Sequence, residues 1–155
     1  MTVDDMDLKI LEFLQEDGRL PHATIGEKIG LTGPSVYSRI KRLEREGVIR
    51  GYTVLLNAEA MGRGLVAFIR LATQTTANEY QPFEEFVLNE PLIMECYDVD
   101  GEDSYILKVQ TDTPQNLRAL LSRLRGFPGV TRTVTSIALY TIKEAGSSGL
   151  NITKN

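Results

Sequence analysis

The spacing of apolar residues changes near residue 60, and this change divides the chain into two parts. Up to Gly47, apolar residues recur every three or four positions, which is the helical period. From Leu65 onward, short alternating runs typical of strands are mixed with helical stretches. A chain of 155 residues has room for two small domains. The predicted boundaries are residues 1–56 for the first domain, 57–64 for a linker, 65–144 for the second domain and 145–155 for a frayed tail.

The first part contains three helix patterns in fewer than 50 residues. The first runs from a cap at Asp4 or Asp5 to about Glu16, the second covers His22 to Ile29, and the third follows the N-cap Thr32 and ends at Gly47. A tight turn at Gly30–Thr32 separates the last two helices, which indicates a helix-turn-helix. Extended segments on either side of Arg50-Gly51 predict a small hairpin, or wing, after the third helix.

The second part predicts a four-stranded sheet with two helices. The strands are expected at Leu65–Ala72, Ile93–Val99, Tyr105–Gln110 and Val130–Ile142, and Thr76 and Thr113 are expected to open the two helices. The order βαββαβ is the ferredoxin-like pattern, so the fold class is α+β. Two helices cover one face of such a sheet, yet the first and last strands carry apolar residues on both faces. A second subunit is the simplest cover for the other face, so we expect an obligate dimer.

Positive charge is concentrated in one short segment of a chain whose net charge is -4. Residues 33–50 hold five basic side chains against two glutamates. In a helix-turn-helix the third helix enters the major groove of DNA. Base contacts are predicted for Ser35, Tyr37, Ser38 and Arg42, phosphate contacts for Lys41, Arg45 and Arg50, and a place nearer the core boundary for Arg39, the last of the DNA-binding set. Two alternatives stay open: a merely solvated helix face, and packing of Tyr37 against the second helix.

Cysteine and histidine are too scarce for a clustered metal or catalytic site. The chain has one of each, Cys96 and His22, far apart in sequence. No phosphate-binding glycine loop is present, so we expect no enzyme activity, no metal and no cofactor. Cys96 is expected to be a small buried apolar side chain, and His22 to be solvated. The lack of a disulfide, of a secretory signal and of a long apolar run predicts a cytoplasmic protein without membrane contact.

Several motifs in order resemble the leucine-responsive/AsnC (Lrp/AsnC, feast-famine) transcriptional regulators. They are Asp7–Gln15 with Asp17-Gly18-Arg19, Leu31–Glu44, Gly47–Tyr52, Glu95–Val99, Gly101 and Pro128-Gly129-Val130. The resemblance implies a winged helix-turn-helix joined to a ferredoxin-like ligand-binding domain of the RAM/ACT type. It also implies dimers that pair through their sheets and assemble further, for example into octamers, and an amino-acid effector bound near the turn after the second strand.

That turn departs from the family pattern. The family usually has Gly-x-x-Asp followed by an aromatic residue, whereas here Ser104 stands at the aspartate position. The predicted ligand-binding residues are Val99, Asp100, Gly101, Glu102, Asp103 and Ser104 in the turn, and Thr133, Thr135 and Ser136 on the last strand. The alternative is an ordinary solvated turn in which Gly101 supplies a positive φ. Gly26 also replaces a usual alanine, at a cost of about 1 kcal/mol in helix propensity.

These features together predict a sequence-specific DNA-binding transcription regulator whose assembly or DNA affinity responds to an amino acid or a related metabolite. The alternative is a stand-alone metabolite-sensing regulatory subunit that acts on protein partners. The acidic net charge favours the alternative slightly, whereas the basic third helix favours the regulator.

Overall fold

A computed structural model describes residues 3–74 and 81–144 of the chain, without the side chain of Gln81. The described chain forms two compact units. The second contains Leu56–Thr141, and the first contains the residues up to Leu55 and those from Ile142. Residues 57–64, predicted as a linker, therefore group with the second unit, where the Asn57 Oδ1 atom accepts a hydrogen bond of 3.0 Å from the amide of Ala60. Within the described ranges, no helix is long and apolar enough to cross a bilayer.

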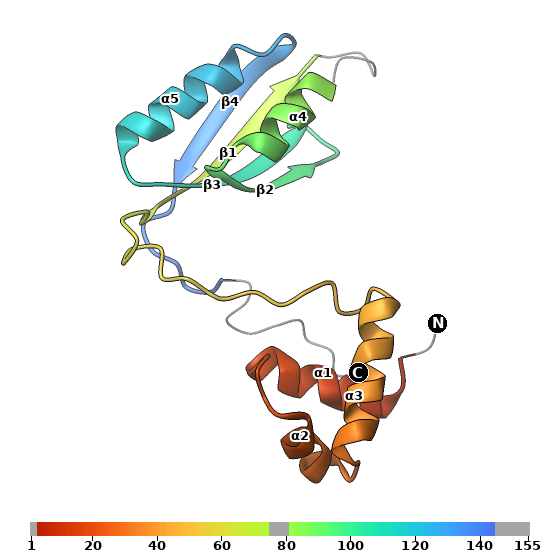
Figure 1. Cartoon of the computed structure of the whole chain (residues 1–155). Coiled ribbons are helices and arrows are strands. Elements are labelled where there is room, and N and C mark those ends of the chain that lie inside the picture. The colour runs from red at the N-terminus through yellow and green to blue at the C-terminus, as the bar shows by residue number, and fades with distance from the viewer. Residues whose placement is uncertain (1–2, 75–80, 145–155) are drawn as a thin grey trace. The chain divides into compact units, whose positions relative to one another are not determined.

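The first unit is a bundle of three helices (Figure 1). They are α1 (Asp5–Glu16), α2 (His22–Ile29) and α3 (Gly33–Arg45), so the three predicted helices are confirmed. The three helices pack around a common core. Ile10 of α1, Ile25 of α2, and Val36 and Ile40 of α3 are buried there. This small core is consistent with the limited apolar area that a domain of about 50 residues can bury.

Side-chain caps and one close turn fix the ends of these helices. Asp4 caps α1, because its carboxylate accepts a hydrogen bond of 2.8 Å from the amide of Asp7. Thr32 caps α3 through the amide of Ser35, as predicted. A Cβ atom at Gly26 would lie 2.4 Å from the carbonyl oxygen of Leu31. The turn between α2 and α3 approaches so closely that only glycine fits at this position without a shift of the backbone.

The predicted hairpin after α3 is wrong. None of residues 46–56, all of which the structure describes, lies in a strand. The amides of Val48 and Ile49 both donate to the carbonyl oxygen of Leu43, at 2.9 and 3.1 Å, and thereby close the end of the helix. Because these two donors are already used, they cannot form a ladder with the segment from Tyr52. Among the described residues, the helix-turn-helix therefore has no wing.

The second unit has the predicted ferredoxin-like topology. Its elements are β1 (Leu65–Thr73), α4 (Gln81–Asn89), β2 (Ile93–Asp98), β3 (Tyr105–Thr111), α5 (Pro114–Arg125) and β4 (Val130–Ile137). The strands form one antiparallel sheet in the order β2-β3-β1-β4. The prediction that Thr76 opens the first helix falls outside the described residues.

The last strand is shorter than predicted. It ends at Ile137 instead of Ile142, and Ile137 pairs with Ala67 of β1. Only β1 neighbours β4 in the sheet, and β1 begins at Leu65. The amide of Ala138 still donates to the carbonyl of Val66, but residues 139–142 have no strand to pair with in the part of the chain that the structure describes.

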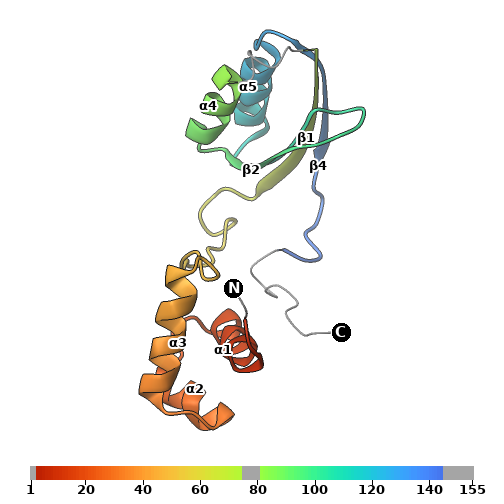
Figure 2. The ribbon, with the colours of Figure 1, turned by 90° about the vertical axis from the view of Figure 1, so that its right-hand side faces the viewer.

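Both helices of the second unit lie on one face of the sheet (Figure 2). The core lies between them and the strands, where side chains such as Ile69, Leu107 and Leu120 are fully buried. On the opposite face Phe68 and Tyr97 are 43% and 57% exposed, and Ile106 is half-buried. This outer face therefore carries exposed apolar side chains, as the alternation predicted, together with the charged Arg70, Glu95 and Lys108. The described residues cover only the other face.

Candidate DNA-binding helix and ligand pocket

Helix α3 presents a polar face opposite its buried stripe. Val36, Ile40 and Leu43 point into the first unit and are buried. Ser38, Lys41 and Arg45 are exposed on the other side, and Ser35 is half-buried in the first turn. At 100° per residue, a buried stripe of Val36, Ile40 and Leu43 places Ser38, Lys41 and Arg45 on the opposite side, and the structure has this orientation. An exposed polar helix face of this kind fits the major groove of duplex DNA.

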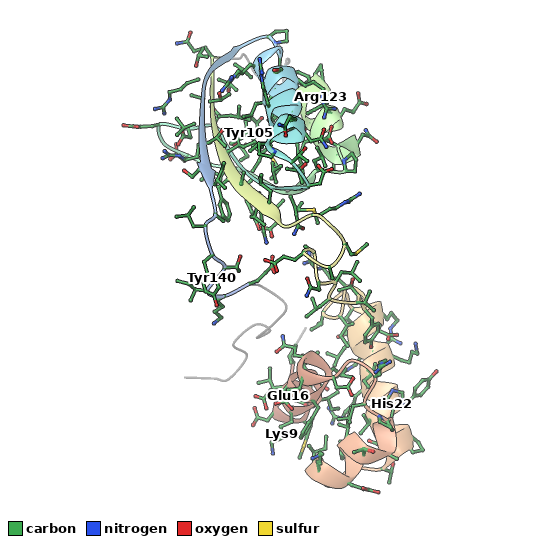
Figure 3. The ribbon with its side chains drawn as sticks, turned by 90° about the vertical axis from the view of Figure 1, so that its left-hand side faces the viewer. Lys9, Glu16, His22, Tyr105, Arg123 and Tyr140 are labelled. Atoms are coloured by element: carbon green, nitrogen blue, oxygen red, sulfur yellow. The ribbon has the colours of Figure 1, made fainter. Side chains whose placement is uncertain are left out.

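Tyr37 has both an exposed side and a packed side. It is 48% exposed, and its ring lies 5.6 Å from the ring of His22 at the start of α2, centroid to centroid. The Nζ atom of Lys41 lies 5.7 Å from the Tyr37 centroid, in a cation-π arrangement. His22, labelled in Figure 3, is half-buried by this contact, whereas the sequence predicted a solvated side chain.

Two of the arginines predicted to bind DNA make ion pairs between α3 and the start of α1. Arg39 Nη1 lies 2.6 Å from Asp4 Oδ2 and 2.8 Å from Asp7 Oδ1. Arg42 Nη2 donates to the second carboxylate oxygen of Asp7. Asp7 is fully buried, so this cluster forms an internal ion-pair network. Hydrogen bonding to the Arg39 guanidinium lowers the pKa of Asp4 to about 2 and raises the pKa of Arg39 itself.

Lys41 is also paired within the first unit. Its Nζ atom lies 2.7 Å from Glu44 Oε2, and the hydroxyl of Tyr52 donates to the other Glu44 oxygen at 3.1 Å. The bond to Glu44 raises the pKa of Lys41, and the same bond lowers the pKa of Glu44. Of the five cations between residues 33 and 50, only Arg45 and Arg50 make no ion pair with a described residue.

A pocket of about 290 Å³ opens at the turn between β2 and β3. Five of the predicted ligand-binding residues line it, namely Val99, Asp100, Gly101, Asp103 and Ser104. Gly101 has a φ of 138°, as the turn required. Three further lining residues were missed by the sequence analysis, namely Glu84 of α4, Asp98 of β2 and Tyr105 of β3. Only the packing of α4 against β2 brings Glu84 to this turn, and no sequence spacing reveals that contact.

The remaining predicted ligand residues lie elsewhere or have internal partners. Glu102 is exposed, and Thr133 accepts a hydrogen bond of 2.8 Å from Arg125 Nε. Thr135 Oγ1 is buried without a hydrogen-bond partner among the described residues. Ser136 pairs with Phe68, which places it on the sheet face away from the helices. The structure therefore does not bring the β4 hydroxyls into the pocket.

Two of the lining residues are tied to the sheet. Ser104 Oγ accepts hydrogen bonds from both the amide and the hydroxyl of Thr73, at 3.1 and 3.0 Å. Asp103 Oδ1 lies 2.9 Å from Arg132 Nη2, and Asp103 Oδ2 lies 3.8 Å from Arg70 Nη1. The pocket carboxylates that make no ion pair within the described ranges are Glu84, Asp98 and Asp100.

The side chains of Cys96 and Tyr105, near this pocket, are packed against their neighbours. Burial, with Asp98 and Glu84 nearby, raises the pKa of the Cys96 thiol to about 11, which suits a packed side chain better than a reactive one. Tyr105, labelled in Figure 3, packs against Phe83 with 4.6 Å between ring centroids. Among the described residues, no group of His, Cys, Asp or Glu side chains is arranged to hold a metal ion.

Comparison with known proteins identifies the class to which this helix-turn-helix and this ligand domain belong. Residues 3–44 match the family model of the AsnC-type helix-turn-helix domain, and residues 66–148 match that of the Lrp/AsnC ligand binding domain. The HTH-type transcriptional regulator FL11 of Pyrococcus furiosus is 34% identical over 142 residues, which cover 92% of this chain and 93% of FL11. The leucine-responsive regulatory protein of Escherichia coli is 32% identical over 145 residues, which cover 92% of this chain and 88% of that protein.

A solved structure supports the same assignment. A transcriptional regulator of Neisseria meningitidis, crystallised as its L-Met complex, superposes with a TM-score of 0.88 at 32% identity, over 97% of this chain and 98% of that chain. The chain belongs to the Lrp/AsnC family. It is a helix-turn-helix DNA-binding transcriptional regulator, and its relatives are regulators and not enzymes. The sequence-based predictions of function and of an α+β fold, with a helix-turn-helix followed by a ligand-binding domain, are thereby confirmed, apart from the wing.

Proposed function

We propose that this regulator binds duplex DNA through α3 and changes its assembly or DNA affinity when an amino acid binds in the β2–β3 pocket. Two similar structures carry L-methionine: the Neisseria regulator, and the feast or famine regulatory protein of M. tuberculosis, which is 32% identical with a TM-score of 0.81. The domains proposed for these roles are residues 1–56 and 65–144, with 57–64 as the connection and 145–155 as the tail. The protein would act in the cytoplasm, where its DNA target lies.

The exposed face of α3 carries the DNA-binding proposal. Ser35, Tyr37 and Ser38 lie in its first turns, and we assign base contacts to them. Arg45 and Arg50, with Lys41, are assigned to phosphates, because flexible cations supply affinity with little sequence information. Arg39 and Arg42 belonged to the predicted set as well, but their guanidinium groups are engaged by α1.

The pocket lining suits the two charged ends of an amino acid. The unpaired carboxylates of Glu84, Asp98 and Asp100 can accept hydrogen bonds from an α-amino group. Backbone amides of the turn around Gly101 can donate to an α-carboxylate. A free volume of about 290 Å³ accommodates one small metabolite. No other cofactor is proposed.

The exposed apolar face of the sheet is proposed as a dimer interface. Phe68, Tyr97 and Ile106 lie on this face, away from the helices, together with the half-buried Val66. The same face of a second copy can bury them, since a sheet face of this kind packs well on another sheet. Dimers would assemble further into octamers or other rings of dimers. Sedimentation equilibrium checks this proposal: a folded Phe68→Asp variant should be monomeric at a concentration where the wild type is dimeric.

One selection experiment tests DNA binding and ligand response together. Duplexes are selected from a random pool by the full chain, and binding of the selected duplex is then measured with each amino acid added in turn. We expect a defined duplex sequence to emerge and at least one amino acid to change the affinity or the assembly state. Recovery of no preferred sequence at low salt would contradict sequence-specific binding by this chain.

Adjacent glutamates on α4 provide a matched pair for the pocket. Both are exposed, but only Glu84 lines the pocket. Glu84→Gln should weaken the amino-acid response, and Glu85→Gln should leave it unchanged, while both variants keep wild-type DNA affinity without effector. An equal response in both variants would show that the effector binds elsewhere.

A further inference from the structure

The most strongly buried charge in the first unit belongs to α1, yet its partners lie on the DNA-binding helix. Asp7 is fully buried, and its two carboxylate oxygens accept hydrogen bonds from Arg39 and Arg42. The half-exposed Asp4 adds a second contact to Arg39, at 2.6 Å. Residues 39 and 42 are one turn apart, so two successive points of α3 are fixed to the start of α1. We call the four side chains Asp4, Asp7, Arg39 and Arg42 the acid clamp.

The acid clamp removes positive charge from the surface that meets DNA. The two aspartates balance the two arginines, and the side chains of Arg39 and Arg42 are only 29% and 34% exposed. Pulling either guanidinium away would leave the buried carboxylate of Asp7 short of a partner, which is strongly unfavourable. A DNA phosphate therefore competes for these arginines against a partner that is already in place and desolvated.

This competition bears on specificity. Phosphate contacts raise affinity for every duplex alike, so each additional free arginine on α3 would strengthen non-specific binding more than it strengthens recognition. We propose that Asp7, assisted by Asp4, is a specificity-determining positioning residue that withholds Arg39 and Arg42 from the DNA backbone and fixes the rotation of α3. Arg45 and Arg50, with Lys41, then supply the phosphate contacts. The inference rests on the proposed contact of α3 with DNA.

The salt dependence of DNA binding tests the inference on the full chain. Two duplexes of equal length serve as probes: one selected from a random pool by the wild type, and poly(dI-dC) as non-specific DNA. Asp7→Asn should raise the affinity for poly(dI-dC) on the order of tenfold at 0.1 M salt and steepen the slope of log K against log salt by about 0.9 for each arginine released. The ratio of specific to non-specific affinity should fall. A purely structural role of Asp7 would weaken binding to both duplexes and would not steepen the slope.

Substitutions of the arginines test the same idea from the other side of the ion pairs, and Arg42→Gln leaves Asp7 its hydrogen bond from Arg39. Arg42→Gln should leave the salt slope at the wild-type value, whereas the matched Arg45→Gln should make it shallower by about 0.9. The inference is overturned if Arg42→Gln flattens the slope as much as Arg45→Gln does. If neither substitution changes the slope, Arg45 does not contact a phosphate and the proposed binding mode, which assigns it one, fails as well.

A milder variant covers the case in which Asp7→Asn does not fold. Asp4→Ser keeps a side chain that caps α1 but removes the charge that Arg39 contacts. It should raise affinity for poly(dI-dC) in the same direction and by less than Asp7→Asn. A folded Asp4→Ser protein with unchanged non-specific affinity and slope would count against the acid clamp as a specificity device.

Discussion

The two units of this regulator are each stabilised internally by different kinds of contact. The first unit buries few apolar side chains, and it combines them with a fully buried aspartate, two arginines and a reciprocal cap between Asp4 and Asp7. The second unit relies on a larger apolar core between one sheet and two helices. It also leaves the other sheet face apolar and partly exposed, around Phe68 and Tyr97.

This difference matches the two tasks. Ion pairs and caps are directional, so they can fix the rotation of a short helix that a small core would leave loosely determined. Apolar burial is stronger per residue and not directional, which suits a domain that must stay folded while it associates with other copies. Polar contacts therefore orient the DNA-binding helix, and apolar contacts stabilise the sensing unit.

The largest effect is expected from a cavity in the second core. Leu107→Ala removes a fully buried side chain at the centre of the sheet and should destabilise the second unit by about 2 to 5 kcal/mol. Hydrogen exchange resolved by peptide should show faster exchange in β1 and β3 and little change in α1–α3. The neighbouring Ile106→Ala, on the outer face, should perturb association more than the core. Equal loss of protection from exchange in both units would contradict the expectation that the cavity destabilises only the second unit.

A close turn gives the largest expected effect in the first unit. Gly26→Ala would improve helix propensity by about 1 kcal/mol, but the new Cβ would lie 2.4 Å from the Leu31 carbonyl oxygen. We expect a net destabilisation of about 1 to 2 kcal/mol, since overpacking costs more than propensity gains. Thermal unfolding measures the change, and Glu27→Ala at the next, exposed position serves as the control. A stabilised Gly26→Ala protein would show that the backbone of the turn at Leu31 shifts at little energetic cost.

The fold was largely predictable because local signals dominate it. Two helix starts were marked by a threonine, a residue that often caps helices, with a proline in the first turn. Pro34 follows Thr32 by two residues, and Pro114 follows Thr113 directly. Alternating apolar residues marked β3 as a strand, and Tyr105, Leu107 and Val109 on one of its sides are buried. Two errors arose where partners far along the chain decide the outcome. The hairpin failed because Leu43 engages the amides of Val48 and Ile49, and the last strand stopped where β1 begins.

The candidate site was predictable in its orientation but not in its pairing. Helical periodicity placed Ser38, Lys41 and Arg45 on the exposed face of α3, and the structure agrees. It could not show that Arg42 is held by Asp7, which lies 35 residues earlier. The acidic composition of the first helices was visible in the sequence, but only packing shows which carboxylate meets which arginine. The same holds for Glu84, which reaches the pocket from another element.

The two threonine caps allow a balanced comparison of the units. Thr32 Oγ1 accepts from the amide of Ser35 at 3.3 Å, and Thr113 Oγ1 accepts from the amide of Asn116 at 3.2 Å. Thr32→Ala and Thr113→Ala should each cost about 1 kcal/mol, because each leaves one helix amide without a partner. Hydrogen exchange should locate each loss in its own unit. A much larger cost for Thr32→Ala would show that capping matters more where the core is small.

The smallest expected effect separates the units by their response to acid and salt. In the folded first unit Arg39 lowers the pKa of Asp4 from its ordinary value of 3.8 to about 2. A carboxylate with a lowered pKa stabilises the fold above its unfolded value, so this contribution is complete above about pH 4 and is lost as the pH falls toward 2. In the second unit the Asp112 carboxylate has a lowered pKa for another reason, since it accepts hydrogen bonds from Asn116 and Thr111.

Salt should distinguish these two aspartates, because only Asp4 has a charged partner. Acid titration followed by hydrogen exchange should show that 1 M salt weakens the pH dependence of the first unit, as screening shortens the range of the attraction between Asp4 and Arg39. The pH dependence that Asp112 gives the second unit should persist in salt, since neutral donors maintain it. Asp4→Ser should remove the salt-sensitive part and leave the second unit unchanged. If salt affected both units equally, the acid response would come from overall charge repulsion and not from the ion pairs that orient α3.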